Sequence, residues 1–75
     1  MESQEQQLRQ QLLASDEAFA RLAREHSGYD SILQELAGRP HLSETEQIEE
    51  HRLKKLKLAL KDQMEQIIHR HLQLA

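Results

Sequence analysis

The sequence predicts an all-α protein: an antiparallel hairpin of two long, coiled-coil-like helices, able to pair with a second copy as a four-helix bundle. Three observations support this fold class. The 75 residues include only two glycines and one proline and are rich in Leu, Gln, Glu, Lys and Arg, which is a helical composition. Apolar residues recur at helical spacing on both sides of the middle. The proline and one glycine fall together between the two apolar series.

The first helix is predicted over about residues 4–36. Its inward series alternates steps of four and three, as in a left-handed coiled coil. The series consists of Leu8, Leu12, Ser15, Phe19, Leu22, His26, Tyr29, Leu33 and Leu36. Two features leave the continuity of this helix open. The stretch 15–17, Ser-Asp-Glu, can act as a new N-cap that makes 4–14 a separate segment, and Gly28 weakens the helix by up to about 1 kcal/mol relative to Ala.

The turn is predicted over residues 37–43. Gly38 can take the left-handed conformation that often ends a helix, and Pro40 prevents the helix from continuing. Ser43 and Glu46 then fit a capping box at the start of the next helix. A stop, a turn and a start this close together are typical of two antiparallel helices.

The second helix is predicted over about residues 44–72. Two successive steps of four in its apolar series resemble a stutter, which locally unwinds a coiled coil. The series consists of Ile48, Leu53, Leu56, Leu60, Met64, Ile67, His71 and Leu74. In an antiparallel hairpin with this turn, Phe19 is expected to lie near Leu60 and Leu12 near Ile67.

The two helices are expected to meet along one inner seam. On the first helix it comprises Leu12, Phe19, Leu22, Tyr29, Leu33 and Leu36, and on the second Ile48, Leu53, Leu56, Leu60, Met64 and Ile67. We expect one domain over residues 1–75. Such a small chain without disulfides gains stability most simply by self-association.

Composition excludes several kinds of site and function. Without cysteine the chain has no disulfide, no thiolate metal site and no Cys nucleophile. Its net charge of −3 argues against a general nucleic-acid binder. No apolar run approaches the roughly 20 residues of a membrane span, and the polar start MESQEQQLRQ is unlike a secretory signal, so we expect a cytoplasmic protein.

Residues 51–64, HRLKKLKLALKDQM, carry the most distinctive pattern. They resemble the signature of the YdcH-like proteins, the family called domain of unknown function 465. The matching positions are Leu53, Lys54, Lys55, Lys57, Leu58, Leu60, Lys61, Asp62 and Met64, preceded in the first helix by Phe19, Leu22, His26, Asp30 and Leu33. Tyr29 stands where the family usually has Leu. The resemblance implies a small bacterial helical hairpin with no established enzymatic activity, and it supplies no catalytic residues.

Leu58 is the most informative residue for function. It lies about 200° around the helix from Leu56 and Leu60, so it cannot share their face. Leu72 lies on nearly the same line, which suggests a second apolar seam and a symmetric homodimer. The candidate partner surface places lysines around this leucine and consists of Lys54, Lys55, Lys57, Leu58 and Lys61.

These residues predict a non-enzymatic interaction or small regulatory module that binds a second copy or another protein helix. No catalytic, cofactor or metal site is expected; His69 and His71, for example, point to opposite sides of a helix. Three alternatives stay open. The same lysines can bind RNA or another anion, residues 52–74 can lie on a membrane surface, or the lysines form a solvated face that balances acids such as Asp30.

Overall fold

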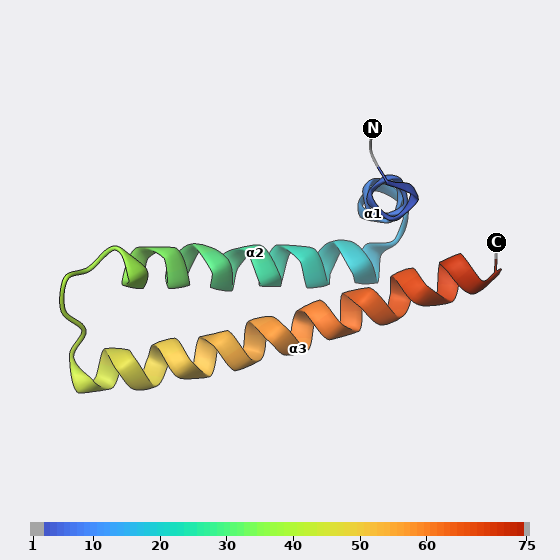
Figure 1. Ribbon diagram of the computed structural model, residues 1–75. Coiled ribbons are helices and arrows are strands. Elements are labelled where there is room, and N and C mark those ends of the chain that lie inside the picture. The colour runs from blue at the N-terminus through green and yellow to red at the C-terminus, as the bar shows by residue number, and fades with distance from the viewer. Residues whose placement is uncertain (1–2, 75) are drawn as a thin grey trace.

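The computed structural model describes residues 3–74, which form three helices and no strand. They are α1 (Gln4–Ser15), α2 (Glu17–Ala37) and α3 (Glu44–Leu74). Helices α2 and α3 run antiparallel side by side, and α1 crosses the open end of this hairpin, where it is seen nearly end-on (Figure 1). The all-α class is confirmed, but the chain has three helices instead of two. The domain predicted over 1–75 includes residues 1, 2 and 75, which lie outside the described part.

The prediction of one continuous helix over 4–36 is wrong, because the helix is interrupted at Asp16. This residue is extended (φ −114°, ψ 107°), and its carboxylate accepts a hydrogen bond from the Phe19 N–H at 3.0 Å. Its own N–H donates to the Leu12 carbonyl at 2.8 Å and so closes α1. A side chain that accepts a hydrogen bond from the backbone N–H three residues ahead in this way favours a cap over a helix interior. The alternative of a new N-cap in the stretch 15–17 is therefore confirmed, whereas α2 runs through Gly28 without a break.

The connection between α2 and α3 confirms one predicted cap and corrects another. The Ser43 hydroxyl accepts from the Glu46 N–H at 3.1 Å, and the Ser43 N–H donates to the Glu46 carboxylate at 3.0 Å, which is the predicted capping box. Gly38 is not left-handed: it is right-handed (φ −79°, ψ −8°), with its N–H bonded to the Gln34 carbonyl at 3.2 Å. The helix ends instead because Pro40 disfavours the helical conformation in the residue before it.

Seven of the eight buried apolar side chains within residues 3–74 form two clusters, and the eighth, Leu60, belongs to neither. The first lies where α1 crosses the open end of the hairpin and consists of Leu12, Phe19, Met64 and Ile68, with Leu8, Leu22, Ala23, Ile67 and Leu72 packed against it. The second lies toward the turn and consists of Leu33, Leu36 and Leu53, with Tyr29 and Leu42 packed against it. The first cluster therefore holds α1 against α2 and α3, and the second packs the loop residue Leu42 against both helices of the hairpin.

The register between α2 and α3 differs from the predicted one. Phe19 packs with Met64 and Ile68, one and two turns beyond the expected Leu60, although Ile67 does join the cluster that contains Leu12. At the other end Leu36, in the last turn of α2, packs with Leu53. The first turns of α3 therefore extend past the end of α2.

This shift corrects the predicted seam of α3. Ile48 is 66% exposed because it lies five residues before the buried Leu53, about 140° around the helix, and so points away from α2. Leu56 is 37% exposed at the edge of the hairpin. Lys57 instead takes the inward position between Leu53 and Leu60, and Ile68 is almost fully buried. The inward positions 53, 57, 60 and 64 then alternate steps of four and three, and the two successive steps of four that resemble a stutter fall at 60, 64 and 68 instead of at 56, 60 and 64.

Candidate docking groove

One flank of the hairpin carries an open groove between α2 and α3, with a volume of about 530 Å³. Its lining comes from both helices: His26, Leu33, Gln34 and Ala37 of α2, and Lys54, Lys57, Leu58 and Lys61 of α3. Leu33 is buried at its base, whereas 59% of Leu58 is exposed. The groove thus combines apolar side chains with a rim of lysines, and no carboxylate lines it.

The lysines share this flank because Lys54, Lys57 and Lys61 are spaced by three and four residues. Lys57 donates to Asp30 of α2 in an ion pair that links the two helices. Asp30 also accepts from the Gln34 amide at 3.0 Å. This ion pair holds Lys57 in the lining of the groove and fixes the position of α2 along α3.

Charge within the groove is partly neutralised by neighbouring acids. The Lys57 ion pair uses Asp30, and Lys54 lies 3.6 Å from Glu50, one turn earlier on α3. Lys54 is exposed and Glu50 only partly buried, and pairs at the surface contribute little to stability, so Lys54 can exchange its partner at small cost. Lys61 makes no ion pair within residues 3–74. Two ammonium groups of the rim are therefore open to an incoming carboxylate.

The structure brings together four of the five residues of the predicted partner surface. Lys54, Lys57, Leu58 and Lys61 line the groove, whereas Lys55 lies on another side of α3, in a shallow depression of about 410 Å³. That depression is lined by Ile48, His51, Arg52, Lys55 and Leu56. Leu72 does not extend the Leu58 line across the surface, because it packs against the first core cluster. The predicted second apolar seam is therefore confined to Leu58.

Sequence reasoning missed the contribution of α2 to the groove. His26 and Leu33 belong to the inward heptad series, so they were expected to be covered by the second helix. Gln34 and Ala37 carried no signal, since their place beside Leu58 follows only from the register of the two helices. The groove thus depends on the register between α2 and α3 as much as on the lysines of α3.

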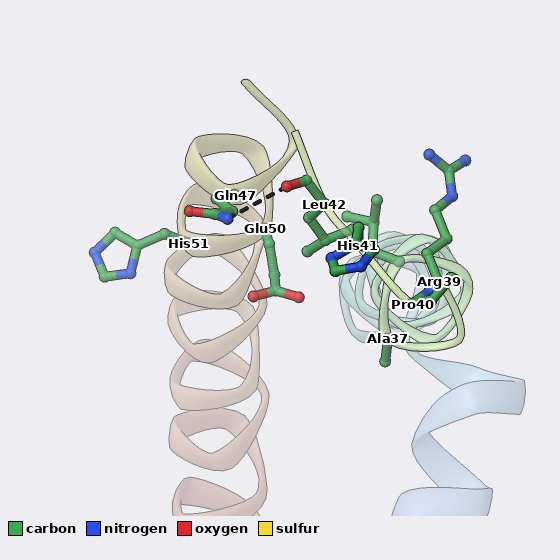
Figure 2. Close-up of a pocket in the computed structure, with 9 residues that line it drawn as sticks. Ala37, Arg39, Pro40, His41, Leu42, Gln47, Glu50 and His51 are labelled. Atoms are coloured by element: carbon green, nitrogen blue, oxygen red, sulfur yellow. Dashed lines mark hydrogen bonds between the residues drawn. The ribbon is translucent and has the colours of Figure 1, made fainter. Parts of the chain in front are cut away.

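A second hollow, of about 610 Å³, lies at the turn and is lined by loop residues and the start of α3 (Figure 2). There the Gln47 amide donates to the Leu42 carbonyl at 3.3 Å, which holds the loop against α3. Figure 2 shows the His51 ring directed away from Glu50 and from the loop. The polar side chains that line this hollow do not converge on a common point. Within residues 3–74 no three His, Asp or Glu side chains gather in a way that would hold a metal ion.

Two carboxyls have shifted pKa values. Asp30 lies in the ion pair between α2 and α3, and Glu46 lies in the capping box at the start of α3. The hydrogen bond from Lys57 lowers the pKa of Asp30, and the hydrogen bond from the Ser43 N–H lowers the pKa of Glu46. A carboxyl whose pKa is lower in the folded state stabilises the fold above its unfolded pKa. That contribution disappears as the pH falls through the lower folded pKa.

We therefore expect the free energy of unfolding to fall as the pH drops from about 5 to about 2. Asp30→Asn should destabilise the protein at pH 7 because it removes the pair with Lys57, and the difference from wild type should shrink at low pH. Urea unfolding at pH 7 and at low pH measures both quantities. Glu25→Gln is the matched control, because Glu25 is exposed on the same helix and makes no ion pair within the described residues. A difference that stays constant across the pH range would contradict the role of the Asp30 carboxylate.

None of the helices in the described part of the chain is both long enough and apolar enough to span a membrane.

Comparison with known families identifies the chain. The family described as protein of unknown function, DUF465, matches residues 19–68, which is more than half of the chain. The chain belongs to this family. The match covers most of α2 and most of α3, including Asp30, Lys57 and every residue that lines the groove, and it leaves α1 outside. The resemblance drawn from the lysine block is thus confirmed. No curated protein and no solved structure matches the chain.

Proposed function

We propose that this DUF465 protein is a non-enzymatic interaction module that binds an acidic amphipathic helix of another protein in the lysine groove. The observation that carries the proposal is the combination of an exposed leucine with lysines in a groove lined by no carboxylate. An amphipathic helix lays its apolar face into such a groove, and carboxylates on its flanks meet the lysines.

The apolar part of the groove supports a helix over a small anion. Leu33, Ala37 and Leu58 offer contact to a row of apolar side chains spaced by three or four residues. Lys54 and Lys61 stand on the rim, where an acid one turn away from the apolar row of the partner can reach them. No Phe, Tyr or Trp lines the groove, and His26 is the single ring in its lining, so the groove offers no row of rings on which successive bases of RNA could stack.

Pairing of two copies through this groove is disfavoured by charge. A symmetric contact would place the lysine rim of one copy against the lysine rim of the other, and like charges directly opposed are destabilising. An acidic partner meets no such repulsion. The groove therefore favours a different protein over a second copy.

A photo-crosslinking amino acid at position 37, inside the groove, tests the proposal in cell lysate. It should crosslink to a protein through an acidic helical segment, and Leu58→Glu should weaken this capture at least about tenfold. The same probe at position 18, on the exposed side of α2 away from the groove, is the control. Leu13→Glu, on α1, is the matched control for Leu58→Glu because Leu13 is also about half exposed.

The same experiment separates the other classes of partner. Capture of protein should survive nuclease treatment and decline only moderately with salt, because apolar contacts carry part of the affinity. Binding of RNA would disappear with nuclease and fall steeply with salt. Crosslinks only to nucleic acid or lipid, or equal crosslinking from positions 18 and 37, would overturn the proposal.

A further inference from the structure

The flank of the hairpin opposite the groove carries a second unpartnered apolar surface. Gln34 and Leu58 line the groove, and Ile32 and Leu56 each lie two residues away from them, about 200° around their helices. Ile32 is 45% exposed and Leu56 37% exposed. Both residues therefore face solvent on the same side of the hairpin, away from the lysine groove.

The register places these two residues level with each other. The ion pair joins Asp30 to Lys57 across the hairpin, and α2 and α3 run in opposite directions (Figure 1). Ile32 follows Asp30 by two residues, and Leu56 precedes Lys57 by one. They form a patch that spans both helices, here named the outer patch.

We infer that the outer patch binds the same patch of a second copy in a symmetric dimer. With the twofold axis along the hairpin, α3 of one copy lies on α2 of the other, and Ile32 meets the partner's Leu56 twice in each dimer. Such an isologous contact turns two hairpins into a four-helix bundle. This surface is separate from the groove, so the dimer and the proposed partner binding can fail independently.

Charges beside the patch favour this arrangement. Arg52 precedes Lys57 by five residues, and Glu35 follows Asp30 by five, so Arg52 and Glu35 are level on opposite helices. The twofold axis brings Arg52 beside the partner's Glu35. Within residues 3–74, the one ion pair of Glu35 is with Arg39, at 3.4 Å; it is largely exposed and therefore weak. The outer patch is therefore self-complementary in charge, unlike the lysine groove.

The size of the core supplies an independent reason for a second copy. Eight apolar side chains within residues 3–74 are buried, and the chain exposes 5929 Å². Chains of this size without disulfides or metal commonly depend on self-association. A stable dimer covers about 800 Å² on each partner, an area that faces of two helices can supply.

Sedimentation equilibrium of the full chain tests the inference. We expect a dimer at micromolar concentrations and expect Ile32→Glu to raise the dissociation constant at least about tenfold, with the helical circular dichroism retained. Leu13→Glu and Leu58→Glu should leave the dimer intact, because Leu13 lies on α1 and Leu58 lies in the groove.

A charge exchange tests the geometry of the dimer. Arg52→Glu and Glu35→Arg should each weaken dimerisation, and the two changes together should restore part of the lost affinity. A wild-type monomer at high micromolar concentration would overturn the inference. So would a dimer that survives Ile32→Glu, a dimer that is lost with Leu58→Glu, or a double variant weaker than both single variants.

Discussion

Replacing Phe19 with Ala is expected to lower the free energy of unfolding by about 3–5 kcal/mol, which is a large part of the stability of a domain this small. Phe19 is 1% exposed and packs with Leu12, Met64 and Ile68. Phe19 of α2 thus shares one buried cluster with residues of α1 and α3, and it is the only buried Phe, Tyr or Trp among residues 3–74. The cavity left by Ala would loosen α1 and the open end of the hairpin together. Urea unfolding followed by circular dichroism, at one fixed protein concentration, measures the loss.

Two further variants make the Phe19 result interpretable. Phe19→Leu fills most of the cavity and should remain folded with a smaller loss, so a value is obtained even where Phe19→Ala unfolds. Leu13→Ala removes a residue of the neighbouring α1 that is 48% exposed, and its effect should stay within about 0.5 kcal/mol. Equal losses from Leu13→Ala and Phe19→Leu would contradict the packing of α1 across the hairpin.

Replacing Ile68 with Ala is expected to cost about 2–5 kcal/mol, and replacing Ile67 with Ala about half of that or less. Ile68 is 1% exposed within the first cluster, whereas its neighbour Ile67 is only half-buried against that cluster. The two residues are identical in chemistry and adjacent in the chain, so they form a matched pair. Thermal or urea unfolding of the two variants side by side gives the comparison.

The order of these two losses decides between two registers. The apolar periodicity alone assigns Ile67 to the seam and leaves Ile68 between the faces, whereas the structure buries Ile68. A larger loss of unfolding free energy from Ile67→Ala than from Ile68→Ala would therefore support the register predicted from the sequence and contradict the register of the structure.

Much of the architecture could be read from local signals. Asp16, Ser43 and Pro40 act through their own backbone or that of residues close in sequence, so their roles are visible without tertiary structure. The lysine block identified the family for a similar reason, since its pattern is contiguous. The break at Asp16 could be offered only as an alternative, because the heptad series continues through it and gives no sign that α1 turns away.

The errors in the seam arose from the register between distant segments. Ile48 and Leu56 fit the apolar period of α3 but are exposed, whereas Lys57 takes an inward position that hydropathy alone assigns to solvent. The aliphatic stem of a lysine can lie along an apolar surface while its ammonium group reaches a carboxylate, here that of Asp30. The sequence named Asp30 among the acids that the lysines could balance, but it did not single out Lys57 as the lysine that pairs with it.

By itself the sequence determined that the chain is helical, where the turn falls, which cap starts α3 and to which family the protein belongs. These properties depend on contiguous residues, whose interactions are formed within a turn or two of helix. Only the tertiary structure decided that α1 crosses the hairpin, that Ile68 is buried and that Leu58 faces a groove shared with α2. The crossing of α1 depends on the break at Asp16 and on packing in the first cluster. The other two depend on the register of α2 and α3, which is fixed by the packing of Leu36 on Leu53 and the pairing of Asp30 with Lys57. Helical periodicity specifies which face of a helix is buried, but it does not specify which residue of another helix lies opposite.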